Sequence, residues 1–162
     1  MSDGVVAEKT VDANDQHYEV PPEFFKKVLG KRLKYSCSLF NGQTTLDEAE
    51  DNMLDLYIER ANILNGQEIL DLGCGWGSFS LYAAAKFPGS NITSVSNSFD
   101  QINFINKEAE KRNLKNIKAI KMDVNNLNLD NHFDRIISIE MFEHLRNLSL
   151  IHISEPTRPR II

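Results

Sequence analysis

The feature that most constrains this chain is a set of alternating glycines that follows a short apolar stretch. Residues 68–78 read Glu-Ile-Leu-Asp-Leu-Gly-Cys-Gly-Trp-Gly-Ser, so a strand-like run passes through Asp71 into glycines at every second position. Helix-spaced apolar residues follow, at Phe79, Tyr82, Ala83, Ala84 and Phe87. Glycine adopts positive φ and lets a ligand approach the backbone. This order therefore predicts a nucleotide-like ligand at the carboxyl end of the first strand of an α/β sheet.

Strand and helix patterns continue to alternate after this turn. We expect strands at 91–95, 117–121 and 133–139. Between the first two of these, Ser98 has the spacing of a helix cap and opens a helix that runs to about Arg112. Such alternation predicts a doubly wound, mostly parallel α/β sheet, of which four strands are recognisable.

The N-terminal part is predicted to be a helical cap on this sheet. A short helix is predicted at Glu23–Leu29, and Gly30 is expected to end it. Residues 33–40 are expected to form a mixed extended segment. Thr45–Glu48 has capping-box spacing and opens a long helix, which Asn65-Gly66 is expected to end. One face of that helix should pack on a core through residues spaced by three and four: Leu46, Ala49, Met53, Tyr57, Ala61 and Leu64.

These patterns divide the chain into four segments. Residues 1–15 are expected to be a disordered lead-in, 16–65 the helical cap, and 66–147 a partial ligand-binding domain. Residues 148–162 show neither a helical continuation nor a strand with a helix partner. They resemble the translated sequencing-adapter peptide that contaminates predicted open reading frames. We therefore expect a gene fragment with a foreign tail and little activity of its own; the alternative is an unusual natural C-terminus.

Composition argues against several classes of partner. The net charge of −5 disfavours nucleic acid, and no apolar run approaches the roughly 20 residues of a membrane span. Two cysteines without metal-ligand spacing, and no signal peptide, favour free thiols, no metal site and a reducing, cytoplasmic compartment. One basic cluster is expected to be a solvated surface, with attraction to anionic lipid, and so at most peripheral membrane contact, as the alternative: Lys26, Lys27, Lys31, Arg32 and Lys34.

Five stretches, in order along the chain, carry a resemblance to a known family: Gln16–Pro21, Leu33–Cys37, Thr45–Ala49, Asp71–Gly77 and Glu140–His144. Together they resemble the cyclopropane-fatty-acyl-phospholipid synthase superfamily of class I S-adenosylmethionine-dependent methyltransferases. Within it they are most similar to the coclaurine N-methyltransferase-like branch. The resemblance covers about residues 16–147 and implies a Rossmann-like class I methyltransferase fold. Complete members have seven strands, so we expect an incomplete version of that fold here.

The resemblance implies S-adenosylmethionine as the cofactor. The glycine turn is expected under its methionine part, with Asp71 near the ammonium group or a bridging water, and Tyr35 and Ser36 over the carboxylate end. Residues after the second strand would face the ribose and adenine, although generic class I enzymes carry an acid there. Asp123 could accept from the adenine amino group or be a simple turn aspartate. The expected cofactor-binding residues are Tyr35, Ser36, Asp71, Gly73, Cys74, Gly75, Gly77, Asn97, Gln101 and Asp123.

The reacting end is expected at Glu140, Glu143 and His144, which follow the fourth strand at the edge where such sheets bind ligands. Their spacing lets them share one face of a beginning helix. An amine must lose a proton before it attacks the methyl group of a sulfonium, and nearby carboxylates stabilise positive charge. The alternative is an ordinary acidic first helical turn, which the helix dipole also favours.

Two branches of the family remain open for the acceptor. In the lipid branch the methyl group goes to an alkene of a phospholipid acyl chain, and bicarbonate removes the resulting proton. The cysteine and glutamate that hold this bicarbonate match Cys37 and Glu143, although Cys37 could equally be a buried structural cysteine. Glu140 occupies a position that is usually glycine in the lipid branch and glutamate in the amine branch. Glu140 therefore favours a small-molecule amine.

Other classes fit less well. An inactive S-adenosylmethionine-binding fragment is the alternative from another class. An NAD oxidoreductase is disfavoured by Ser78, which occupies the place of the third glycine in a dinucleotide fingerprint. A nucleic-acid base methyltransferase is disfavoured because no Asn/Asp-Pro-Pro-aromatic motif follows the fourth strand.

Overall fold

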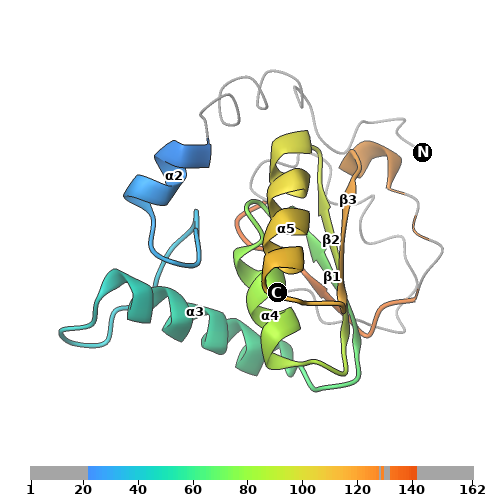
Figure 1. The fold of residues 1–162 in the computed structure, drawn as a ribbon. Helices are drawn as coiled ribbons and strands as arrows, with labels where there is room; N and C mark the ends of the chain where they lie inside the picture. Colours follow the sequence, from blue (N-terminus) through green and yellow to red (C-terminus); the bar gives the residue numbers. More distant parts are fainter. Residues whose placement is uncertain (1–21, 128, 130–131, 142–162) are drawn as a thin grey trace, which may run out of the picture.

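The computed structural model describes residues 22–127, 129 and 132–141, which form a parallel sheet with helices packed on it (Figure 1). The elements in chain order are α2 Pro22–Val28, α3 Leu46–Ala61, β1 Glu68–Leu72, α4 Ser78–Lys86, β2 Asn91–Ser96, α5 Phe99–Lys111, β3 Ile117–Lys121, the short 3-10 helix η1 Val124–Asn126, and β4 Arg135–Ile137. All three strand pairs are parallel, and the strand order is β3-β2-β1-β4. The predicted α/β fold is confirmed, and the central position of β1 puts its carboxyl end between those of β2 and β4.

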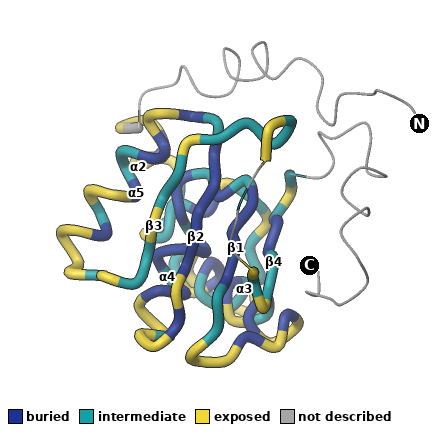
Figure 2. Tube along the Cα trace, turned by 90° about the vertical axis from the view of Figure 1, so that its right-hand side faces the viewer, coloured by how far each residue is buried: buried dark blue, intermediate teal, exposed yellow. Residues whose placement is uncertain are grey.

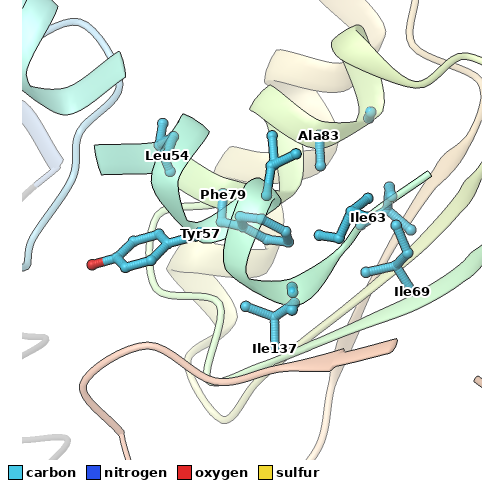
Figure 3. Packing of buried hydrophobic residues seen from close by; sticks show 11 residues of the cluster. Leu54, Tyr57, Ile63, Ile69, Phe79, Ala83 and Ile137 are labelled. Carbon is cyan, nitrogen blue, oxygen red and sulfur yellow. The ribbon is translucent and has the colours of Figure 1, made fainter. Parts of the chain in front are cut away.

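Alternation along the strands separates two apolar layers. On one face, α3 and α4 bury a core that includes Phe79 and Ile69 (Figure 3), and α5 packs beside α4. The opposite face carries Leu70, Leu72 and Val95, and no α-helical residue of the described part of the chain belongs to that second layer. Figure 2 shows the consequence for burial, with the central strands β1 and β2 dark along most of their length.

Helix α3 begins and ends for reasons that are local to its sequence. The Thr45 side chain accepts a hydrogen bond from the Glu48 amide, and the Glu48 side chain accepts from the Thr45 amide, so the predicted capping box is confirmed. The helix ends at Ala61, earlier than the expected Asn65-Gly66, because Asn62 adopts a left-handed conformation with φ of 50°. Within the described residues, no helix combines the length and the apolarity that a membrane span needs.

The buried face of α3 differs in part from the expected one. Ala49, Tyr57 and Ala61 are buried as predicted, but Leu46 is exposed and so is Leu64, which lies beyond the helix end. Three further residues complete the buried face: Glu50, Leu54 and Ile58. The buried face is therefore shifted by one residue along the helix from the predicted face, and it includes the carboxylate of Glu50.

The remaining strand predictions agree with the structure at their centres. Strand β3 has the expected bounds, and β2 is one residue longer than predicted. Strand β4 is limited to Arg135–Ile137, which is shorter than the predicted 133–139. Ladder bonds with β1 reach only from Ile69 to Asp71, so β4 pairs over three positions.

Candidate active site

The loop between β1 and α4 is shaped by three glycines with positive φ. Gly73, Gly75 and Gly77 have φ of 80°, 53° and 77°. The amides of Gly73 and Cys74 both donate to the carbonyl of Val95 on β2, at 2.9 and 3.0 Å, which anchors the start of the loop. At this loop the peptide backbone, rather than any side chain, is the surface that a ligand would meet.

The three glycines are not equivalent. A Cβ at Gly77 would lie 2.6 Å from Cγ1 of Ile105 on α5, and one at Gly73 would lie 2.7 Å from Cγ of Met141. A Cβ at Gly75 would meet nothing within 4 Å. Gly77 and Gly73 therefore serve close packing within the protein, whereas the space at Gly75 is available to a ligand.

Asp71 has its partners inside the protein. Its side chain is 1% exposed and accepts a hydrogen bond from the Ser80 hydroxyl, which in turn accepts from the Ser94 hydroxyl at 2.6 Å. Burial raises the pKa of the Asp71 carboxyl to about 6, and the bond from Ser80 only partly opposes this. Asp71 thus ties β1 to α4 beneath the glycine loop, and its contact with a cofactor ammonium group stays a prediction.

Cys74 contributes its backbone to the loop and its side chain to the core. The side chain packs with Leu81, Ile102 and Ile105, and burial raises the pKa of the thiol well above its usual value. This thiol is therefore an apolar core group at neutral pH.

The residues expected on the ribose and adenine side lie after β2. Ser98 caps α5 by accepting from the Gln101 amide, as predicted. Gln101 is 2% exposed, and its side-chain oxygen accepts from the Ser96 hydroxyl at 2.7 Å. Asn97, which directly follows β2, is half-buried. The bond from Ser96 holds Gln101 in the first turn of α5, and contact of either side chain with a nucleoside stays a prediction.

Asp123 follows β3 and caps the short helix η1. Its carboxylate accepts from the Asn125 amide at 2.8 Å, which is the geometry of a turn aspartate. The structure thus supplies a local role for Asp123, and a role toward adenine stays a prediction.

A row of aromatic rings joins the N-terminal segment to the glycine loop. The Tyr35 ring meets that of Phe25 edge-on, with centroids 5.3 Å apart, and Phe25 lies 5.2 Å from Trp76 in the loop. Trp76 then meets Phe104 of α5 edge-on at 5.5 Å. Phe25 and Trp76 are buried, whereas Tyr35 is 60% exposed. This row brings Tyr35 to the loop side of the molecule, as a residue covering a cofactor would require.

Glu140 meets the N-terminal segment at the end of β4. Its Oε1 accepts a hydrogen bond from the backbone amide of Cys37 at 2.9 Å, across 103 positions of sequence. Glu140 itself is exposed and has φ of 51°, an unfavourable conformation for a residue other than glycine. Next to it, the Met141 side chain occupies the space above Gly73. The structure therefore brings Glu140, Cys37 and the glycine loop to the same end of the sheet.

Glu143 and His144 lie outside the described residues. Their predicted roles as partners of Glu140 stay predictions, and so does the bicarbonate-holding role of Glu143. Among the described residues, no group of three or more metal-binding side chains gathers, so nothing there suggests a metal site.

We call residues 30–39 the strap, because they are bound along their length to α3. The buried Glu50 carboxylate accepts from the amides of Gly30 at 3.0 Å and Arg32 at 2.8 Å. Further along, the Leu39 amide donates to the carbonyl of Ala49 at 3.0 Å. The strap carries Tyr35, Ser36 and Cys37, so α3 sets the position of three predicted site residues.

The expected solvated basic cluster is wrong for its last member. Lys34 is only 3% exposed, and its ammonium group donates to the Ser36 hydroxyl, to the Cys37 carbonyl at 2.5 Å and to the Tyr57 hydroxyl at 3.3 Å. Lys31 and Arg32 are paired with Asp51 on α3. The positions of Lys34 and Glu50 near the site were missed from the sequence, and Tyr57 was predicted only as a member of the buried face of α3.

The parallel sheet and the glycine loop together correspond to the Rossmann-like fold of class I methyltransferases. Residues 6–152 match the family described as mycolic acid cyclopropane synthetase, and the chain belongs to that family. The match begins before residue 16 and ends after residue 147, so it is slightly longer at both ends than the resemblance seen in the motifs.

Known relatives include both branches of the family. The (S)-coclaurine N-methyltransferase of Thalictrum flavum subsp. glaucum is 46% identical over 147 residues, which are 90% of this chain and 41% of the relative. The crystal structure of coclaurine N-methyltransferase bound to N-methylheliamine and SAH superposes with a TM-score of 0.90 at 42% identity, covering 93% of this chain and 44% of that one. The cyclopropane-fatty-acyl-phospholipid synthase of Escherichia coli (strain K12) is 29% identical over 130 residues, 80% of this chain and 32% of the relative. The chain spans about two fifths of the length of the N-methyltransferases it matches.

Proposed function

We propose that this protein is an S-adenosylmethionine-dependent methyltransferase that transfers a methyl group to the nitrogen of a small-molecule amine. The observation that carries the proposal is the position of Glu140 at the loop end of the sheet, next to Met141, whose side chain lies against Gly73. The similarity to plant N-methyltransferases supports the choice of an amine.

The residues of the glycine loop fit the cofactor. Gly75 leaves its space open, and the backbone around it is held by the bonds of Gly73 and Cys74 to Val95. When bound, S-adenosylmethionine supplies an electrophilic methyl group on a positively charged sulfur. The aromatic row through Trp76 closes the loop on the side of α2 and excludes water there.

Glu140 acts on the acceptor side. An exposed carboxylate at the end of β4 can accept a proton from an amine or stabilise its positive charge. The Cys37 amide holds Oε1, which leaves the second carboxylate oxygen for the substrate. Glu143 and His144 follow within one helical turn of sequence and would complete the acceptor side.

Two measurements test the proposal. Titration calorimetry of the chain with S-adenosylhomocysteine should show saturable binding, and no binding would overturn the proposal. Turnover is then measured in a chimera in which residues up to Asn147 of this chain precede the C-terminal part of the Thalictrum enzyme, with an amine panel and with unsaturated phospholipid vesicles. Methylated amine supports the proposal.

The other outcomes assign other functions. Product from the phospholipid alone would establish the lipid branch, which Cys37 and the Escherichia coli relative keep as the second candidate. Binding of S-adenosylhomocysteine without any product in the chimera would indicate a binding module. A Glu140→Gln chimera tests the role of the Glu140 charge, because glutamine can keep the hydrogen bond from the Cys37 amide while removing the negative charge.

A further inference from the structure

Lys34 is a buried cation whose hydrogen bonds go to neutral groups. Its ammonium group donates to the Ser36 hydroxyl, the Cys37 carbonyl and the Tyr57 hydroxyl, and it lies 4.9 Å from the centre of the Tyr57 ring. None of these partners is a carboxylate. Burying an ammonium group costs free energy, and an apolar chain of similar length would fill the same space at lower cost. The hydrogen bonds are therefore what this position gains from a lysine.

Those hydrogen bonds bracket one peptide unit. Ser36 precedes the Cys37 amide and the Cys37 carbonyl follows it, so the ammonium group fixes the chain on both sides of that N–H. The backbone amide of Lys34 donates in turn to Glu50 at 3.4 Å, and the Cys37 amide donates to Glu140 at 2.9 Å. A connected path thus runs from α3 through Lys34 and Cys37 to Glu140.

We propose that Lys34 is a positioning residue for the acceptor side of the site, which aims the Cys37 amide at Glu140 and so sets the direction of that carboxylate. Glu140 also needs this support because its backbone is in a left-handed conformation and its side chain is otherwise exposed. Lys34 acts through other groups, and it is not placed against the reacting atoms.

Burial also lowers the pKa of Lys34, opposed by the nearby Cys37, Glu140 and Glu50. The groups around it on the strap, on α3 and after β4 are thus the same ones that the proposed path connects. The Tyr57 hydroxyl has its pKa raised by burial, so it stays a neutral phenol that can accept from Lys34 while donating to the Cys37 sulfur, 3.7 Å away.

The test follows the Cys37 amide by nuclear magnetic resonance in the full chain. The chemical shift of an amide that donates to a carboxylate changes when that carboxylate is protonated, so acidification should move the Cys37 signal. Glu140→Gln should remove this movement and thereby assign it to Glu140. Lys34→Met should also remove it while other amide signals keep their positions, and Lys34→Arg should restore it in part.

Lys27→Met is the matched control, because it removes an exposed lysine of α2 and should leave the Cys37 movement intact. An unchanged Cys37 movement in Lys34→Met would overturn the proposal. Global loss of signal dispersion in that variant would also overturn it, because Lys34 would then support the fold rather than aim one amide. Tyr57→Phe, which removes one acceptor, should reduce the movement without abolishing it.

This proposal rests on the proposed function only in one respect, because it takes Glu140 to be the group that faces the acceptor. The resonance experiment needs neither cofactor nor acceptor. Its failure is therefore distinguishable from a failure to bind S-adenosylhomocysteine or to methylate an amine.

Discussion

The glycine loop and the strap lie at the same end of the sheet but are held by different kinds of contact. The loop is anchored by backbone bonds to the neighbouring strand, and its shape follows from glycines within five consecutive residues. The strap has no regular secondary structure of its own, and the buried Glu50 carboxylate of α3 holds it through hydrogen bonds from two backbone amides. The glycine loop is thus built into the sheet, whereas the strap depends on contacts with α3 and with Glu140, which is distant in sequence.

This difference has a functional consequence for how the two sides can vary. A change in the loop alters backbone geometry that the core depends on, because Gly77 contacts Ile105. A change at Glu140 alters polar contacts near the surface while the core remains. Substitutions at Glu140 should therefore change chemistry without changing cofactor affinity, and the predictions below test that separation.

The largest expected effect is on cofactor binding at Gly75. Gly75→Ala should weaken S-adenosylhomocysteine binding by about 100-fold, or about 2.7 kcal/mol, because its Cβ enters the open space above the loop. Gly42→Ala is the matched control, since Gly42 also has positive φ and open space around it but lies far from the loop in sequence. Both variants should lose about 1–2 kcal/mol of stability from left-handed strain. Equal calorimetric affinities in the two variants would contradict the assignment of Gly75.

A comparable effect is expected on the acceptor side at Glu140. In the chimera, Glu140→Gln should lower the rate of amine methylation by about 100-fold, the usual range for losing a positioned proton acceptor. Its affinity for S-adenosylhomocysteine should stay within about twofold of the parent, because the Cys37 amide keeps an oxygen acceptor. A parallel loss of affinity and rate would show that the two sides of the site are not separable.

The third expected effect is a pH dependence of stability from Asp71. Its pKa is raised to about 6 in the folded protein, above the ordinary value near 4, so the folded state binds more protons between about pH 4 and 6. Stability should therefore fall as pH rises through this window, by about 2 kcal/mol. Urea denaturation at a series of pH values should show this fall as the difference in stability between the parent and Asp71→Asn. Asp100→Asn, which changes an exposed carboxylate, should follow the parent. A difference that stays constant across the window would locate the titrating group elsewhere.

The smallest expected effect is the difference between the two packed glycines, whose alanine variants share about 1–2 kcal/mol of left-handed strain. Beyond that strain, Gly77→Ala should lower the free energy of unfolding by about 2 kcal/mol, because the new Cβ would overlap Ile105 of the core. Beyond the same strain, Gly73→Ala should cost about 1 kcal/mol, since the flexible Met141 side chain can move away. Denaturant unfolding of both variants measures the difference. A larger cost at Gly73 would mean that Met141 is held more firmly than its position at the end of β4 suggests.

Much of the fold was predictable because its determinants are local. Strand β3 was predicted residue for residue, and the capping box of α3 was read from Thr45 and Glu48. The end of α3 was predicted too late, at Asn65-Gly66, because glycine adopts the left-handed conformation more readily than asparagine. In the structure Asn62 takes that conformation and ends the helix. Strand β4 was predicted too long, because an apolar run shows which residues prefer a strand but not how many find partners on β1.

The candidate site was predictable on its cofactor side and less so on its acceptor side. The glycine motif is contiguous, so its residues could be assigned before any contact was known. Glu140 was predicted, yet its partner is a backbone amide of Cys37, which no side-chain pattern reveals. Lys34 was read as one of several solvated cations, and its burial depends on Tyr57 and Glu50, which approach it only through the tertiary fold.

The position of Trp76 has a practical consequence. It is the single tryptophan of the sequence, it is 3% exposed, and its indole lies between the rings of Phe25 and Phe104. Light absorbed at the red edge of the protein spectrum is therefore taken up by one chromophore, at the junction of the N-terminal segment, the glycine loop and α5. Its emission should report the local environment of that junction, so we expect it to follow ligand binding at the glycine loop without any added dye.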